Sequence, residues 1–235
     1  MKSAASVRES LVDSQNWRLQ EIQDIQFLCG NAAGRSLTVL HRSLVLLLYA
    51  HLEGFTKDAL QEYLNYIAEL NLNCADALPV LATSSLKDEF KCFYDISSGV
   101  RHLPSALKDD LKLRRTAIEA RFVSKSSSLH SKKIAFGVDF IDTESNLDEE
   151  VLRKNLFRLG LDHQQFRKEE AAFSRLKRLR NAIAHGQNDR FADNEEAEKM
   201  IELVSSTMQS LIDNVDKAIK LHLYKKGSTA DFFSP

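Results

Sequence analysis

The sequence predicts an all-α protein, a helical bundle. Only three prolines and eight glycines occur in 235 residues, and this scarcity favours long uninterrupted helices over a fold of many strands. Between residues 35 and 70, apolar side chains recur at steps of three and four, the period of a helix with a buried face. Hydrophobic residues make up 43% of the chain and charged residues 28%, a globular composition. We expect one domain over residues 1–235.

Two long helices are predicted in the first third of the chain. Residues 5–29 form the first, with mixed charge and scattered apolar positions. The central helix spans about 35–70, and its stretch 44–50 is apolar almost all round, which places it in the middle of the core. Its most apolar run is too short to span a bilayer. Because no signal sequence is recognisable and the three cysteines are widely spaced, we expect a reduced, cytoplasmic protein without a membrane segment.

The middle of the chain is predicted to be less regular. We expect residues 71–84 to form a loop, followed by a short helix and then a helix over 104–124 that begins at a proline. The serine-rich segment 124–133 is expected to be a loop, and 134–142 a short extended segment inserted in the bundle. The buried face of 104–124 is assigned to Leu107, Leu111, Ile118 and Phe122.

Three helices are predicted in the last third. One begins at Asn146, whose spacing to Glu149 is that of a capping box, and it ends before Gly160. A second helix is expected over about 163–185, and the last over about 194–224.

The segment RNAIAHG, residues 180–186, lies near the end of the 163–185 helix. Asn181 and His185 are four residues apart and therefore share one face, with Arg180 beside the apolar stripe. Gly186 suits the left-handed conformation that ends a helix. The face expected in the core consists of Phe173, Leu176, Leu179 and Ile183.

Charge around this segment is uneven. The net charge of −1 excludes a chain-wide positive field as the basis of nucleic-acid binding, so any such function must depend on a local surface. We call the basic residues near the segment the basic strip. Its members are Arg167, Lys168, Arg175, Lys177, Arg178, Arg180 and Arg190.

Residue spacing alone favours a structural interpretation of RNAIAHG. A histidine near a helix C-terminus interacts with the helix dipole, and the neighbouring arginines would be solvated surface groups. The segment nevertheless resembles the signature of the HEPN superfamily, an arginine followed by four to six residues and a histidine. Arg180, Asn181 and His185 match that signature.

Other segments resemble prokaryotic HEPN-like nucleases in the same order. LLLYAHLEGFTKDALQEYLNYI at 46–67 is similar to their second helix, and it supplies Glu53 and Lys57 in a Glu-xxx-Lys pattern. NWRLQEI at 16–22 and DTESNLDEEVLRKNLFRLGLD at 142–162 also resemble the family.

The resemblance implies a homodimeric helical bundle with a metal-independent endoribonuclease site, completed by both protomers at the dimer interface. Many such proteins are toxins or act in antiviral and restriction systems, so an antitoxin or another defence-system protein is an implied partner beside the RNA substrate. No cofactor or metal is expected. The implied residues are Arg180, Asn181 and His185 for catalysis, Glu53 and Lys57 in support of Arg180, and Arg175, Lys177 and Arg178 for RNA binding.

The chemistry suits these residue types. RNA contains its own nucleophile, the 2′-hydroxyl, and histidine can accept its proton or donate one to the leaving oxygen, which leaves a 2′,3′-cyclic phosphate. Arginine suits a phosphate whose negative charge grows in the transition state. Glu53 and Lys57 are also spaced for an ordinary surface ion pair, and the residues favour neither interpretation. Two further functions stay open: a non-catalytic HEPN dimer that binds RNA or a protein in a defence or toxin–antitoxin complex, and a purely structural helical dimer.

Overall fold

The computed structural model of the chain describes residues 2–98, 103–104, 107–137, 140–143, 146–187 and 194–228. Within these ranges the regular structure is helical, and β pairing is limited to two isolated bridges, Asn73 with Lys133 and Ala77 with Lys225. The predicted all-α class is confirmed. The helices are α1 (Ala4–Gly30), α2 (Gly34–Glu69), α3 (Pro79–Ser85), α4 (Lys87–Tyr94), α5 (Leu111–Ser131), α6 (Glu149–Arg158), the 3-10 helix η3 (Arg167–Glu169), α7 (Glu170–Ala184) and α8 (Asn194–Lys220).

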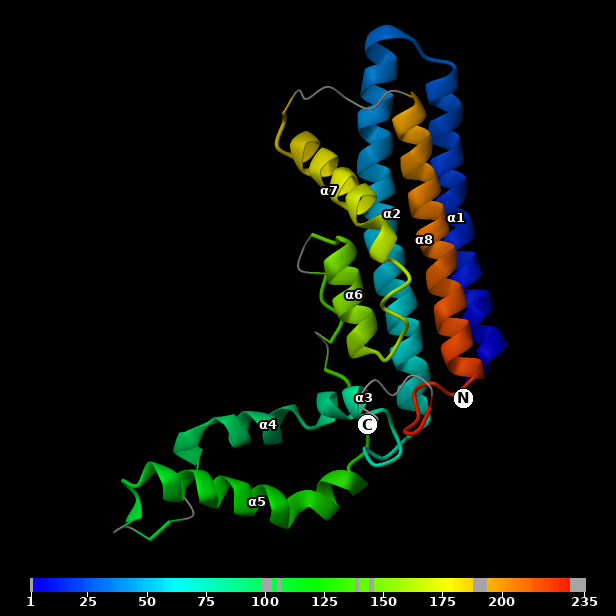
Figure 1. Cartoon of the computed structure of the whole chain (residues 1–235). Helices are drawn as coiled ribbons and strands as arrows, with labels where there is room; N and C mark the ends of the chain where they lie inside the picture. The colour runs from blue at the N-terminus through cyan, green and yellow to red at the C-terminus, as the bar shows by residue number, and fades with distance from the viewer. Residues whose placement is uncertain are drawn as a thin grey trace.

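The core is a bundle of three long helices, α1, α2 and α8, which lie side by side (Figure 1). α2 contacts both other helices, and its Phe55, Leu60 and Tyr63 are fully buried. α7 lies against the middle of α2, and α6 packs beneath α7 (Figure 1). The two long helices predicted over 5–29 and 35–70 are confirmed by α1 and α2.

The last helix ends four residues earlier than predicted, at Lys220 instead of residue 224. His222 has a left-handed φ of 53°, and the Leu223 N–H bonds to the Ala218 carbonyl at 2.9 Å, so the chain turns away there. No helix in the described ranges is both long enough and apolar enough to cross a membrane.

The region between α2 and α6 differs most from the prediction. The expected loop at 71–84 contains α3, which has Pro79 in its first turn. The serine-rich segment expected to be a loop is the second half of α5: Ser128 and Ser131 donate to helix carbonyls one turn back, and Leu129 is buried. In the described part of 134–142 no strand forms, and Ile134 donates to the Leu72 carbonyl at 2.9 Å.

α4 and α5 form a two-helix arm that projects from the base of the bundle (Figure 1). α5 begins at Leu111 rather than at 104, because Asp110 caps it by accepting from two backbone N–H groups. Ile118 is buried, and Phe122 packs against Phe93 with ring centroids 5.2 Å apart. The two residues nearer the arm's tip were wrongly assigned to a buried face, since Leu107 and Leu111 are 44% and 59% exposed.

The N-terminus of α6 lies beside α7 and is set by Asp148, not by Asn146. The Asp148 carboxylate accepts from the Val151 N–H at 2.9 Å, whereas the expected capping box of Asn146 with Glu149 is absent. Glu149 instead pairs with Arg153 at 2.9 Å. Gly160 follows the helix with φ 66°, as predicted for its stop.

α7 begins at Glu170, seven residues later than the helix expected from 163. The chain first makes a turn in which Gln164 donates its N–H to the Asp162 carboxylate at 2.9 Å, and η3 follows. The side-chain amide of Asn214 on α8 fixes this turn, because it both donates to and accepts from the backbone of Asp162.

We predict that Gly160→Ala destabilises the fold by roughly 2–4 kcal/mol. The residue has φ 66°, and a Cβ there would overlap with Cδ1 of buried Leu78. Gly34→Ala is the control, because Gly34 also has a left-handed φ of 58° but nothing lies within 4 Å of its Cβ position. Urea unfolding should show the larger loss at Gly160, and equal losses would contradict a packing role for Gly160.

Candidate active site

α7 presents its predicted apolar face to the core. Phe173, Leu176 and Leu179 are buried at 1–2% exposure, and Ile183 is half-buried at the end of the same stripe. Because this face is turned inward against α2 and α8, the side chains on its flank lie at the edge of the bundle. RNAIAHG occupies the last turn of this helix.

The end of α7 has a defined geometry. Gly186 takes φ 72°, and Gln187 and Gly186 donate their N–H groups to the carbonyls of Ala182 and Ile183 at 2.9 and 3.0 Å, a Schellman motif. The predicted stop at Gly186 is confirmed. Arg42 of α2 donates to the Gln187 carbonyl at 3.1 Å and so joins the end of α7 to α2. His185 is the C-cap residue, and its side chain is exposed.

Arg180 is held on two sides. Its Nη1 donates to the Asn181 Oδ1 at 2.8 Å, and its guanidinium lies 4.7 Å from the ring centroid of Tyr49 on α2. Among the described residues none accepts a hydrogen bond from Nε or Nη2 of Arg180. The guanidinium is therefore positioned while part of its donor fork stays available to an anion.

Tyr49 of α2 provides the aromatic ring over which the Arg180 guanidinium lies. It is 2% exposed, and its hydroxyl donates to the Leu147 carbonyl at 3.2 Å. Burial raises the pKa of Tyr49 to about 12, with the Glu53 carboxylate adding to the rise and the Arg180 guanidinium opposing it. The hydroxyl is therefore neutral at physiological pH, and the ring offers Arg180 a fixed aromatic face.

Glu53 and Lys57 form the ion pair that their spacing predicts. Lys57 Nζ lies 2.7 Å from Glu53 Oε1, which also accepts from the hydroxyl of buried Thr143 at 3.0 Å. No ion pair or hydrogen bond connects Glu53 directly with Arg180. Glu53 and Arg180 both interact electrostatically with Tyr49. Any effect of Glu53 on Arg180 would therefore be electrostatic and would act across the Tyr49 side chain.

The basic strip contains two kinds of cation. Arg175 makes two bonds to the Glu196 carboxylate of α8, at 2.5 and 3.1 Å, and Lys177 lies 2.5 Å from the Asp148 carboxylate at the start of α6. Both cations fasten α7 to neighbouring helices. Arg178 is exposed and has no partner in the described part of the chain. Arg190 lies outside the described residues.

Three supporting residues were missed at the level of sequence: Tyr49, Thr143 and Arg42. The Tyr49 signal was present, since it precedes Glu53 by four residues and so shares its helical face, but the apolar run around it suggested a purely hydrophobic role. Thr143 and Arg42 act across long chain separations, which no local pattern reveals. Within the described ranges, no group of three or more His, Cys, Asp or Glu residues is arranged to hold a metal ion.

Comparison with known families identifies the chain. The profile of the family described as RiboL-PSP-HEPN matches residues 13–220. The chain belongs to this family. The match runs from within α1 to the end of α8, so it includes the arm as well as the bundle of this HEPN protein. No curated protein and no solved structure matched the chain.

We predict that Lys177→Ala lowers the free energy of unfolding of this HEPN protein by about 1–2 kcal/mol near neutral pH. Burial alone would raise the pKa of Asp148, but the bonds from Lys177 and from the Val151 N–H hold that pKa below its usual value. The stabilisation by this ion pair is therefore complete above the pKa of an aspartate in the unfolded chain, about 3.9. It is lost as the pH falls through the lower pKa that Asp148 has in the folded protein.

Chemical denaturation across a pH series measures this difference. Arg178→Ala is the matched control on the same helix, and its stability should equal that of the wild type because Arg178 is exposed. A stability difference at Lys177 that persists below the folded pKa of Asp148 would contradict the ion-pair origin.

Proposed function

We propose that this HEPN protein is a metal-independent endoribonuclease that acts as a homodimer. The principal observation is that a positioned arginine and an exposed histidine both lie at the C-terminal end of α7. Arg180 is held by Asn181 and Tyr49 with donors to spare, and His185 stands exposed at the helix end. Membership of the RiboL-PSP-HEPN family supports an RNA substrate.

Arg180 is assigned to the phosphate. Nε and Nη2, which donate to none of the described residues, can bind two non-bridging oxygens, and the permanent positive charge stabilises the negative charge that grows as the 2′-oxygen attacks phosphorus. Asn181 and Tyr49 fix the guanidinium beforehand, so little reorganisation is needed when the substrate arrives. Asn181 is thus a positioning residue, with its amide N–H₂ left to face the substrate.

His185 is assigned to proton transfer. In its neutral form it accepts the proton of the 2′-hydroxyl, and in its protonated form it donates to the departing 5′-oxygen. Cleavage needs both actions, and one protomer offers one histidine at this site. A two-fold dimer supplies two, which is why we propose that exposed His185 lies at an isologous interface. The products are a 2′,3′-cyclic phosphate and a free 5′-hydroxyl.

The remaining roles follow from the contacts. Arg178 is proposed to bind the RNA backbone, whereas Arg175 and Lys177, whose charges are offset by Glu196 and Asp148, are proposed to hold α7 in place. Glu53 and Lys57 are proposed to steady Tyr49 beneath Arg180. An enzyme of this type, which destroys RNA without a cofactor, suits a toxin or an antiviral effector that a protein partner such as an antitoxin restrains.

We predict that the purified protein cleaves labelled RNA in the presence of EDTA and that His185→Ala slows this cleavage by roughly 100-fold or more. Because His185 is exposed, the variant should unfold like the wild type. His130→Ala is the control, since His130 is an exposed histidine in the last turn of another helix, α5. Sedimentation at micromolar concentration should show a dimer.

Several results would contradict the proposal. Equal cleavage of an RNA with a single 2′-deoxy residue at the cleaved position would exclude the 2′-hydroxyl as nucleophile. A stable monomer that cleaves RNA would exclude the shared site. RNA binding without cleavage by the wild type would favour a non-catalytic binding module, and neither binding nor cleavage would favour a structural role.

We predict that Arg180→Lys lowers the cleavage rate by roughly 100- to 1,000-fold despite the conserved charge. Lysine cannot donate to Asn181 and to two phosphate oxygens in one plane. RNA affinity should fall much less, because most binding energy comes from sequence-independent backbone contacts. Single-turnover rates and anisotropy titrations separate the two quantities. A loss confined to affinity would show that Arg180 binds the ground state only.

A further inference from the structure

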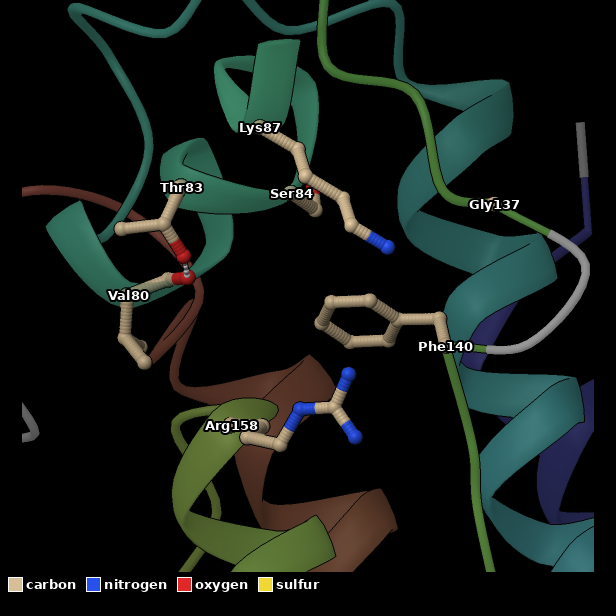
Figure 2. Close-up of a pocket in the computed structure, with 7 residues that line it drawn as sticks. All are labelled: Val80, Thr83, Ser84, Lys87, Gly137, Phe140 and Arg158. Carbon is tan, nitrogen blue, oxygen red and sulfur yellow. Dashed lines mark hydrogen bonds between the residues drawn. The ribbon is translucent and has the colours of Figure 1, made fainter. Parts of the chain in front are cut away.

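A hollow with cationic side chains lies at the base of the bundle, apart from RNAIAHG. It has a volume of about 480 Å³ and opens between α3, the start of α4, the segment after α5 and the end of α6 (Figure 2). Its size falls in the range of small-ligand sites. It is lined by Val80, Thr83, Ser84, Lys87, Gly137, Phe140 and Arg158.

Two cations face this cavity without a carboxylate. Figure 2 shows the Lys87 ammonium and the Arg158 guanidinium on opposite sides of the Phe140 ring. Neither cation has an ion-pair partner among the described residues, unlike Arg153 one turn earlier on α6, which is paired with Glu149. Two cations that line one hollow, and that have no carboxylate partner among the described residues, make its potential positive and so attract an anion.

One carboxylate is close enough to need consideration. Asp142 and Arg158 both line another cavity of about 410 Å³, which shares Arg158 with the first. They form no ion pair there; instead the Arg158 guanidinium lies 4.6 Å from the centroid of Phe140. The arginine is thus directed to the aromatic ring and the larger hollow, where its N–H groups can reach an anion.

Phe140 adds an aromatic surface to the site. Its ring is held by Arg158 on one side and by Phe136, whose ring centroid is 5.2 Å away. The hydroxyls of Thr83 and Ser84 already donate to backbone carbonyls, so toward a ligand they can only accept. An occupant that suits all these groups combines an anion, a flat aromatic ring and N–H donors.

We propose that this cavity binds one nucleotide unit, with the base against the Phe140 ring and the phosphate bound by one of the two cations that flank this ring, Lys87 or Arg158. Bases stack on aromatic side chains whatever their sequence, and lysine and arginine hold phosphate. The unit is either a free nucleotide or one residue of a single-stranded RNA. The proposal rests on the proposed function only in naming RNA as a source of that unit.

The position of the cavity suits an RNA that also reaches RNAIAHG. The start of α6 is joined to α7 by Lys177, and Arg158 stands at the opposite end of α6, roughly 15 Å further along the helix axis. A strand of several nucleotides spans such a distance. The cavity would then anchor the substrate away from the cleaved bond, as a positioning site.

Binding measurements on the full-length chain test the proposal. One probe is a fluorescent single-stranded oligonucleotide with 2′-O-methyl groups, which has no free 2′-hydroxyl and so resists cleavage; the other is AMP. Lys87→Ala, Arg158→Gln and Phe140→Leu are each expected to weaken oligonucleotide binding by roughly fivefold or more. Lys91→Ala, one turn further along α4 and outside the cavity, is the matched control and should bind like the wild type.

Each outcome has a defined meaning. Losses for both probes support a site for the free nucleotide as well as RNA, and losses for the oligonucleotide alone support an RNA subsite. Equal losses at Lys91 and Lys87 would show general electrostatic attraction and overturn the proposal, as would wild-type affinity in all three cavity variants. Thermal unfolding shows whether each variant is folded. If Phe140→Leu is unfolded, Arg158→Gln, at a half-buried position, still tests the proposal. Because no cleavage is measured, the result is independent of the His185 experiment.

Discussion

The structure depends on the need to bury one broad face of α2. Leu44, Leu48, Leu52, Phe55 and Tyr63 are all at most 1% exposed and lie along this face, whereas Leu46 on the other side of the helix is 39% exposed. Each such side chain contributes roughly 1.5–3 kcal/mol only if another element covers it. α1 and α8 cover two sides and α7 covers a third, so the path of α7 across α2 is a consequence of the sequence of α2.

The geometry of the candidate site follows from the packing of α7 on α2. Where α7 closes over α2, its flank carries Arg180, and the facing position on α2 is Tyr49. One helical turn further, Glu53 would be a buried charge without its partners, and it is satisfied by Lys57 from its own helix and by Thr143 from the chain before α6. Tyr49 and Glu53 of α2 therefore lie where α7 and the segment before α6 cover this helix. The packing of α7 on α2 is thus also what positions Arg180 of RNAIAHG.

The sequence predicted the features that depend on local chemistry. The spans of α1 and α2 follow from periodicity and sparse breakers, and the stops at Gly160 and Gly186 follow from the left-handed conformation that glycine accepts. Features that depend on distant contacts were missed. Serines 124–131 compete with the helix in isolation, yet Leu129 finds a buried place and the hydroxyls bond back to helix carbonyls. Asp148 displaces Asn146 as the cap because Lys177, from another helix, stabilises its charge.

The cations of α7 differ in whether a carboxylate pairs with them. Those that are paired hold the fold together, and those that are not are the candidates for binding RNA. Four members of the basic strip lie on α7, and charge alone does not distinguish them as RNA-binding residues: Arg175, Lys177, Arg178 and Arg180. In the structure Arg175 and Lys177 are fastened to Glu196 and Asp148, so binding a phosphate would require them to share or break a charge-assisted bond. Arg178 is exposed. Arg180 is held by a neutral amide and an aromatic ring, and no carboxylate in the described part of the chain forms an ion pair with it. Arg158 at the base of the bundle is held the same way, by Phe140. An arginine supported by an aromatic face rather than by a carboxylate keeps both its geometry and its attraction for an anion, and this chain places one such arginine at RNAIAHG and another beside the cavity of α3 and α6.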